Sequence, residues 1–133
     1  MDRGWIGVDL DGTLAEYDVW RGAGHVGEPI QLMVDRVKRW IDDGVDVRIM
    51  TARVHPSAGA DAEVSRDAIQ AWCAEQFGKT LPVTCEKDFS MLELWDDRAV
   101  RLLWNTGLVS DGSDVNDPLA VSDSDGIGEF ITG

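Results

Sequence analysis

The stretch "GVDLDGTLA", residues 7 to 15, decides the fold of this chain. It overlaps an apolar, strand-like segment from Trp5 to Leu10. At the end of that segment are two aspartates, Asp9 and Asp11, two positions apart. Side chains at positions i and i+2 of a strand point to the same side, about 6.5 Å apart at roughly 3.3 Å per residue. The stretch therefore predicts a buried strand that delivers two carboxylates to one edge of a sheet, followed by a turn at Gly12.

Strand-like and helix-like patterns alternate along the rest of the chain. The expected strands are residues 5–10, 45–51, 81–85 and 92–95. The expected helices run from Pro29 to the stop at Gly44, from about 61 to 77, and from 98 to 105, while residues 15–28 form a loop or small flap. This alternation predicts an α/β, Rossmann-like three-layer fold with a central parallel sheet of about four strands in the order 4-1-2-3.

Polar side chains follow each expected strand. Reactive groups in a parallel sheet gather beyond the carboxyl ends of its strands, so these side chains are expected at one edge. Four independent placements that agree are more specific than any one of them. The residues are Asp9, Asp11, Gly12 and Thr13 after the first strand, Thr51 and Arg53 after the second, Lys87 after the third, and Asp96 and Asp97 after the fourth.

Two carboxylates placed in this way can act on a phosphate ester. Asp9 would attack the phosphorus atom, while Asp11 would protonate the departing oxygen and then act as base for the water that cleaves the aspartyl-phosphate. The phosphoryl oxygens repel Asp9, so a hard cation such as Mg²⁺ is needed, and Asp96 or Asp97 can complete its site.

The other polar groups have roles in the same scheme. Lys87 can pair with the phosphate and with Asp9, Thr51 can donate a hydroxyl hydrogen bond, and Gly12 can let backbone N–H groups face the anion. Each group also has a plain structural reading: Asp97 could cap the last helix, and Lys87 and Arg53 could be solvated surface charges.

A turn or a calcium loop is the alternative reading of the Asp-Leu-Asp-Gly run. A turn remains open for these four residues taken alone. A calcium loop needs Gly at its sixth position and Glu at its twelfth. Counted from Asp9, Gly12 is fourth and Trp20 is twelfth, so the calcium loop is rejected.

Taken together, Asp-x-Asp-Gly-Thr after a strand, a strand ending in Thr51, the later Lys87 and an Asp-Asp pair resemble the haloacid dehalogenase superfamily of phosphohydrolases. The resemblance spans about residues 5–104. It implies that Asp9 is the nucleophile and Asp11 the acid/base. It also implies that the backbone carbonyl of Asp11 joins Asp9 and the Asp96/Asp97 pair around Mg²⁺.

The segments "MTAR" and "WDDRAVRLLW" resemble more narrowly the phosphatase domain of bacteriophage-type polynucleotide kinase phosphatases. That resemblance implies that Arg53 contacts phosphate. The substrate-binding residues implied are Gly12, Thr13, Thr51, Ala52 and Arg53. The segments between the motifs are too short for the cap domain usual in the superfamily, so a capless member is expected.

The expected activity is therefore that of an Mg²⁺-dependent phosphomonoesterase that uses an aspartyl-phosphate. Its substrate would be a nucleotide or the 3′-phosphate of a nucleic-acid end. A small-metabolite phosphatase and a catalytically idle binding module on the same fold are the alternatives. An idle module would be expected to have lost Asp9, Asp11 or Lys87, and all three are present.

Charge and composition limit the functions that this chain can have. The net charge of −13 disfavours a nonspecific nucleic-acid binder, which usually presents a basic face. Residues 110–133 hold six acids and no base, so residues 1–109 are expected to form the phosphohydrolase domain and 110–133 an acidic tail.

No apolar run approaches the roughly 18 residues of a membrane span and no signal pattern is seen, so a cytoplasmic location is expected. An open site also leaves room for a homodimer in which a second subunit closes it.

Overall fold

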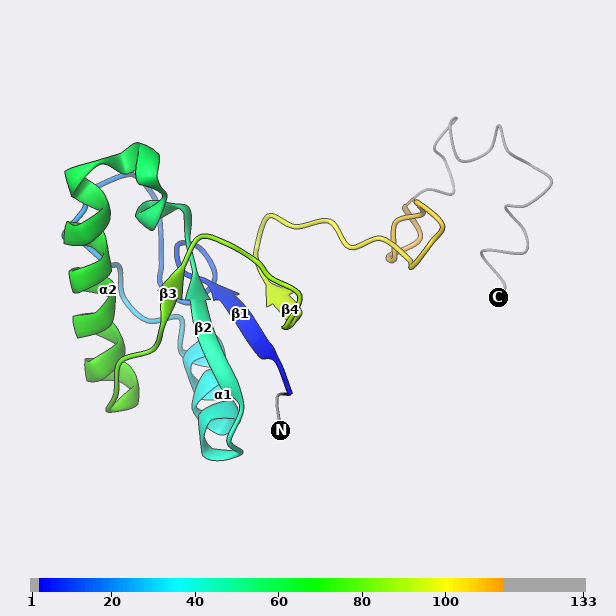
Figure 1. The fold of residues 1–133 in the computed structure, drawn as a ribbon, viewed down its shortest axis with the longest axis horizontal. Coiled ribbons are helices and arrows are strands. Elements are labelled where there is room, and N and C mark those ends of the chain that lie inside the picture. Colours follow the sequence, from blue (N-terminus) through cyan, green and yellow to red (C-terminus); the bar gives the residue numbers. More distant parts are fainter. Residues whose placement is uncertain (1–2, 114–133) are drawn as a thin grey trace. The chain divides into compact units, whose positions relative to one another are not determined.

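The structure, a computed structural model, describes residues 3–113, and it contains one parallel sheet flanked by helices (Figure 1). The strand order β3-β2-β1-β4 is the order expected from the sequence. The strands are β1 (Trp5–Asp9), β2 (Asp46–Met50), β3 (Val83–Thr84) and β4 (Met91–Trp95). The helices are α1 (Gln31–Asp42) and α2 (Ala60–Phe77), with two short 3₁₀ turns, η1 (Ala52–Val54) and η2 (Pro56–Ala58), between β2 and α2.

The two helices share one hydrophobic core with the sheet. Alternate residues of β1 and β2 point toward it because successive strand side chains face opposite sides. From α1 and α2 come apolar side chains at helical spacing. The core residues that these four elements contribute are Val8, Val47, Ile49, Met33, Val34, Val37, Ile69, Trp72 and Cys73.

Trp5 is buried on the other side of β1, outside that core. Its indole Nε1 donates a hydrogen bond to Asp88 Oδ1 (2.9 Å), and the Arg48 guanidinium lies 4.7 Å from its ring centre. Trp5 begins β1, so Asp88 reaches the end of that strand opposite to Asp9. The connection from β3 to β4 is thereby anchored at the far edge of the sheet.

The prediction of a helix over residues 98–105 is wrong. Leu102 instead forms an antiparallel bridge with Val109, and the Leu103 N–H donates to the Leu108 carbonyl (2.8 Å) around a turn in which Asn105 has φ +63°. A helix of eight residues is marginal unless packing stabilises it, and Trp104 is 87% exposed. Asn-Thr-Gly turn chemistry prevails over the helical spacing of the apolar residues.

Among the described residues, the contacts divide the chain after Asp97. The division falls before the boundary near 109 expected from composition. Nearly all of the expected acidic tail, residues 114–133, lies outside the described residues. Within residues 3–113, no helix has the length and apolar character needed to cross a bilayer.

Candidate active site

Three carboxylates meet where β1 and β4 end. Asp9 is the last residue of β1, and Asp96 and Asp97 directly follow β4. The two strands are parallel neighbours with Val8 opposite Trp95, so their carboxyl ends arrive together. One oxygen from each of Asp9, Asp96 and Asp97 lies within 4.8 Å of the others. The structure thus brings together the three side chains that the sequence assigned to a metal.

Thr13 and Gly12 hold the turn after β1 against this cluster. The Thr13 Oγ1 lies 3.2 Å from Asp9 Oδ2 and 3.1 Å from Asp97 Oδ1, and it accepts a hydrogen bond from the Asp97 N–H (3.0 Å). Gly12 has φ +87°, and a Cβ there would lie 2.8 Å from Asp97 Oδ2. The positive φ therefore favours glycine, and the absence of a Cβ leaves room for the Asp97 carboxylate.

The surroundings of Asp9 disfavour its negative charge. Burial, the hydrogen bond with Asp97 and the charge of Asp96 raise the pKa of Asp9 from its ordinary 3.8 to about 7. Three carboxylates at this spacing are relieved either by a proton or by a cation, since an opposite charge favours the ionised form. An all-oxygen set of this kind is what hard divalent cations prefer, so the residues fit Mg²⁺.

Replacing Asp9 by Asn should stabilise the metal-free protein. Because the folded state raises the pKa of Asp9, ionisation opposes folding as pH rises from about 4 toward 7. The gain should be negligible near pH 4 and reach on the order of 1–2 kcal/mol above pH 7, after allowance for solvent screening. Urea unfolding in EDTA at pH 4 and pH 8 measures it, with exposed Asp42→Asn as the control. An equal effect at both pH values would contradict the origin in charge.

Asp11 lies in a different environment from Asp9, because it is paired with Arg53. The guanidinium of Arg53 donates two hydrogen bonds to it, from Nε to Oδ2 (2.8 Å) and from Nη2 to Oδ1 (2.7 Å). The Arg53 side chain is 6% exposed and that of Asp11 22%. Arg53 is set in place by η1, where its backbone N–H donates to Thr51 Oγ1 (3.2 Å). The first strand therefore presents one carboxylate to an anionic cluster and the other to a cation.

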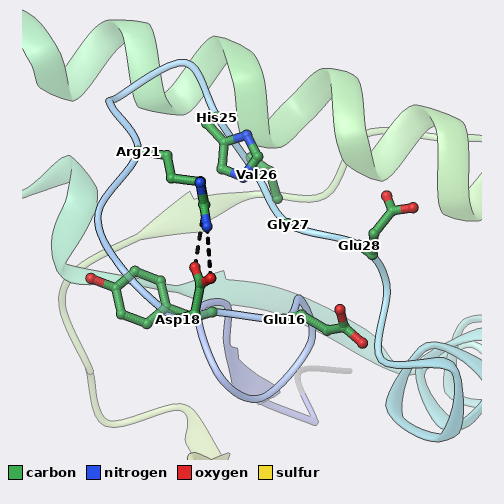
Figure 2. A pocket seen from close by; sticks show the side chains of 8 residues that line it. Glu16, Asp18, Arg21, His25, Val26, Gly27 and Glu28 are labelled. Carbon is green, nitrogen blue, oxygen red and sulfur yellow. Dashed lines mark hydrogen bonds and ion pairs between the residues drawn. The ribbon is translucent and has the colours of Figure 1, made fainter.

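Residues 16–28, which we call the flap, form a closed loop beside Asp11. The Glu16 N–H donates to the Glu28 carbonyl (2.8 Å) at its base, where a Cβ on Gly27 would overlap the Glu16 carbonyl. The flap encloses a hollow of about 490 Å³ (Figure 2). Its lining is Glu16, Tyr17, Asp18, Arg21, His25, Val26, Gly27 and Glu28. Neither the acidic cluster nor Asp11 is part of this lining, and the hollow is linked to Asp11 through His25 and Arg53.

Several expected site residues are not arranged as the sequence indicated. Lys87 is exposed, and among residues 3–113 it makes no hydrogen bond or ion pair, so the expected pair with Asp9 is not formed. Its neighbour Asp88 is bound to Trp5 at the opposite edge of the sheet, which explains the placement. Ala52 is exposed at the start of η1.

The backbone of the Gly12 turn is also used differently. The Gly12 N–H donates to the Ala15 carbonyl (2.8 Å) and the Thr13 N–H to the Leu10 carbonyl (3.2 Å). These two N–H groups are thus engaged within the turn rather than directed at an anion. Thr51 is buried, and its Oγ1 accepts from Arg53. The carbonyl of His25, which contacts Arg53, was not singled out from the sequence, and no local pattern marks it.

Comparisons with known proteins bear on the fold alone. No protein-family model matches the sequence, and no curated protein matches it significantly. A solved structure, that of a conserved protein coded by a locus of Bacteroides thetaiotaomicron, is similar with a TM-score of 0.50 and 21% identity. The similarity covers 73% of this chain and 78% of that one. At this identity the likeness supports the α/β architecture and carries no activity with it.

Proposed function

We propose that this protein is an Mg²⁺-dependent phosphomonoesterase that works through an aspartyl-phosphate. The observation that carries the proposal is the division between the two aspartates of the first motif. Asp9 lies in a cluster of carboxylates whose oxygens are within 4.8 Å of one another. Asp11 instead accepts two hydrogen bonds from the Arg53 guanidinium. A nucleophile beside a cation site and a separate proton-transfer group are the two parts that this chemistry needs.

The proposed reaction balances with these two side chains. Asp11 enters the first step protonated. Asp9 forms a bond to phosphorus as the bond to the ester oxygen breaks, and Asp11 gives its proton to that oxygen. In the second step Asp11 takes a proton from the water that attacks the phosphorus, and the carboxylate of Asp9 is released. Asp11 is then protonated again and ready for the next ester.

Mg²⁺ would be held by the carboxylates of Asp9, Asp96 and Asp97, with the backbone carbonyl of Asp11 as a further expected ligand. When bound, it supplies positive charge that offsets the charge of the phosphoryl oxygens. The substitutions Asp96→Asn and Asp97→Asn should each weaken Mg²⁺ binding at least about tenfold, because each removes a charged oxygen ligand. Titration calorimetry measures this, and Glu75→Gln on the exposed side of α2 is the control. Unchanged affinity in both variants would exclude the assignment.

The substrate proposed is a nucleotide or the 3′-phosphate of a nucleic-acid end, with few contacts beyond the terminal residue. Residues 1–109 carry a charge of 12 − 19 = −7, and the flap hollow is lined by three acids and one arginine. Neither favours a long polyanion, so efficiency should depend weakly on oligonucleotide length. The same lining favours the second candidate, a phosphatase of small metabolites. A cytoplasmic location and a homodimer are part of the proposal.

A screen of phosphate esters tests the activity. We expect phosphate release in Mg²⁺ and none in EDTA from a panel of mononucleotide 3′-phosphates, 3′-phosphorylated oligonucleotides of increasing length and sugar phosphates. Efficiency that rises steeply with length would show an extended nucleic-acid groove. Turnover of sugar phosphates alone would favour the small-metabolite phosphatase, and no turnover of any ester would refute the phosphatase proposal.

A further inference from the structure

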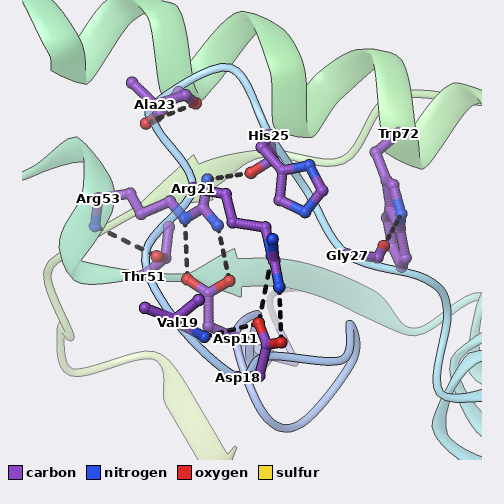
Figure 3. A network of polar contacts seen from close by, with 11 residues as sticks. Asp11, Asp18, Val19, Arg21, Ala23, His25, Gly27, Thr51, Arg53 and Trp72 are labelled. Carbon is purple, nitrogen blue, oxygen red and sulfur yellow. Dashed lines mark hydrogen bonds and ion pairs between the residues drawn. The ribbon is translucent and has the colours of Figure 1, made fainter.

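All three nitrogens of the Arg53 guanidinium donate a hydrogen bond within the protein, which takes up three of its five N–H groups. Nε and Nη2 bind the two oxygens of Asp11, and Nη1 donates to the carbonyl of His25 in the flap (2.6 Å), as Figure 3 shows. One face of the guanidinium is covered by Trp20, whose ring centre is 4.9 Å away. Arg53 therefore joins three parts of the chain: the turn after β1, the flap and the η1 turn that carries it.

We propose that Arg53 is a positioning residue that ties Asp11 to the flap, and that it is not a ligand of the substrate phosphate. The inference rests on the proposed phosphatase function, for which Asp11 is the proton-transfer group. It differs from the role that the sequence resemblance implies for Arg53.

The geometry argues against a phosphate role for this side chain. One N–H on Nη1 and one on Nη2 are outside these three bonds, but the Arg53 side chain is only 6% exposed, which leaves them little surface to offer a phosphate. A guanidinium that turned outward to bind a phosphate would have to leave Asp11, whose side chain is 22% exposed. Breaking one partner from a largely buried, bidentate pair is unfavourable because it leaves the other charge uncompensated. Contact with Trp20 on one face and the bond to His25 hold the plane of the fork in its present orientation.

The flap end of this link is built into the fold. The flap is fastened to α2 at two other points, where Ser65 Oγ donates to the Ala23 carbonyl (3.1 Å) and Trp72 Nε1 donates to the Gly27 carbonyl (3.0 Å). Arg53 adds a third anchor at His25, whose side chain lines the flap hollow. Arg53 thus contacts both Asp11 and a residue that lines the flap hollow.

Loss of Arg53 should slow the cleavage of some esters more than others, according to their leaving group. An alkoxide leaves only with a proton, so a misplaced Asp11 slows its departure. A nitrophenolate leaves without one, so cleavage of its ester depends little on Asp11 in the first step. kcat/KM reports that first step, whereas a lost phosphate ligand would affect both esters alike.

The test compares Arg53→Gln and Arg53→Lys with the wild type on an alkyl phosphate and on p-nitrophenyl phosphate. We expect kcat/KM to fall about 100-fold or more on the alkyl ester and less than about tenfold on the aryl ester, in the range of general acid catalysis. Inhibition by inorganic phosphate should change less than about threefold. Lysine should not rescue, because a point charge cannot replace the fork. Equal losses on both esters, weaker phosphate inhibition and rescue by lysine would overturn the proposal.

Arg48→Gln is the matched control, because Arg48 also lies over a tryptophan, Trp5, and binds an aspartate, Asp46 (2.9 Å). It should show no leaving-group selectivity. A second readout is independent of activity: trypsin should cut after exposed Arg21 faster in Arg53→Gln than in Arg48→Gln. Equal cleavage would overturn the link to the flap. A wild type inactive on both esters would refute the phosphatase function, and the trypsin result would still decide whether Arg53 holds the flap.

Discussion

Asp9→Asn should lower the turnover of a phosphate ester at least a thousandfold, on the order of 4 kcal/mol of barrier. Asn lacks the charged oxygen that attacks phosphorus, and it also removes one of the three carboxylates proposed for Mg²⁺. Steady-state phosphate release in saturating Mg²⁺ measures the effect. The metal-free variant should be at least as stable as the wild type, so loss of activity cannot be ascribed to unfolding.

Two controls separate the roles of Asp9. Asp42→Asn makes the same chemical change at an exposed position at the end of α1 and should keep full activity. Circular dichroism of Asp9→Asn should match that of the wild type. A folded Asp9→Asn protein with near-normal turnover would show that another group attacks the phosphorus, and the aspartyl-phosphate mechanism would be lost with it.

Asp11→Asn should be severely slow on alkyl phosphates, by about 100-fold or more, because the leaving oxygen departs without a proton. With p-nitrophenyl phosphate the first step should survive. Since Asp11 also activates the water of the second step, the phosphorylated Asp9 should accumulate. Stopped-flow absorbance should then show a burst of nearly one equivalent of nitrophenolate, followed by slow release of phosphate.

The Arg53 contact supplies the control for this variant. Asp11→Asn leaves the Arg53 guanidinium without its charged partner, which has its own structural cost. The double variant Asp11→Asn/Arg53→Gln removes both, and its activity loss should be much less than the product of the two single losses because both act through one group. Strictly multiplicative losses, or normal alkyl phosphate turnover in Asp11→Asn, would show that Asp11 does not transfer the proton.

Most of the fold and the acidic half of the site could be predicted from local sequence patterns. The alternation of apolar strands with helical spacing is a property of short segments, and it predicts β1, α1, β2, α2 and β4 to within a few residues. Parallel strands end at one edge, so placing Asp9 beside Asp96 and Asp97 required only the strand order.

The failures came where no local pattern decides the outcome. The apolar residues of 98–105 repeat at helical spacing, yet helix formation in so short a segment depends on packing. Lys87 follows β3 as expected, but the connection it belongs to is fixed by the Asp88–Trp5 hydrogen bond across 83 positions. A hydrogen bond at that separation leaves no trace in the periodicity of either segment.

The sequence by itself determined that this chain forms a parallel α/β sheet with an acidic edge. The strand and helix periods, and the polar residues at strand ends, are patterns among residues close together in the sequence. Only the tertiary structure decided that Arg53 binds Asp11 and the flap. Arg53 and Asp11 are 42 positions apart, and Arg53 and His25 are 28 apart. Which partners a long, flexible side chain reaches depends on the packed positions of all three segments, and those positions exist only after the sheet and α2 have assembled.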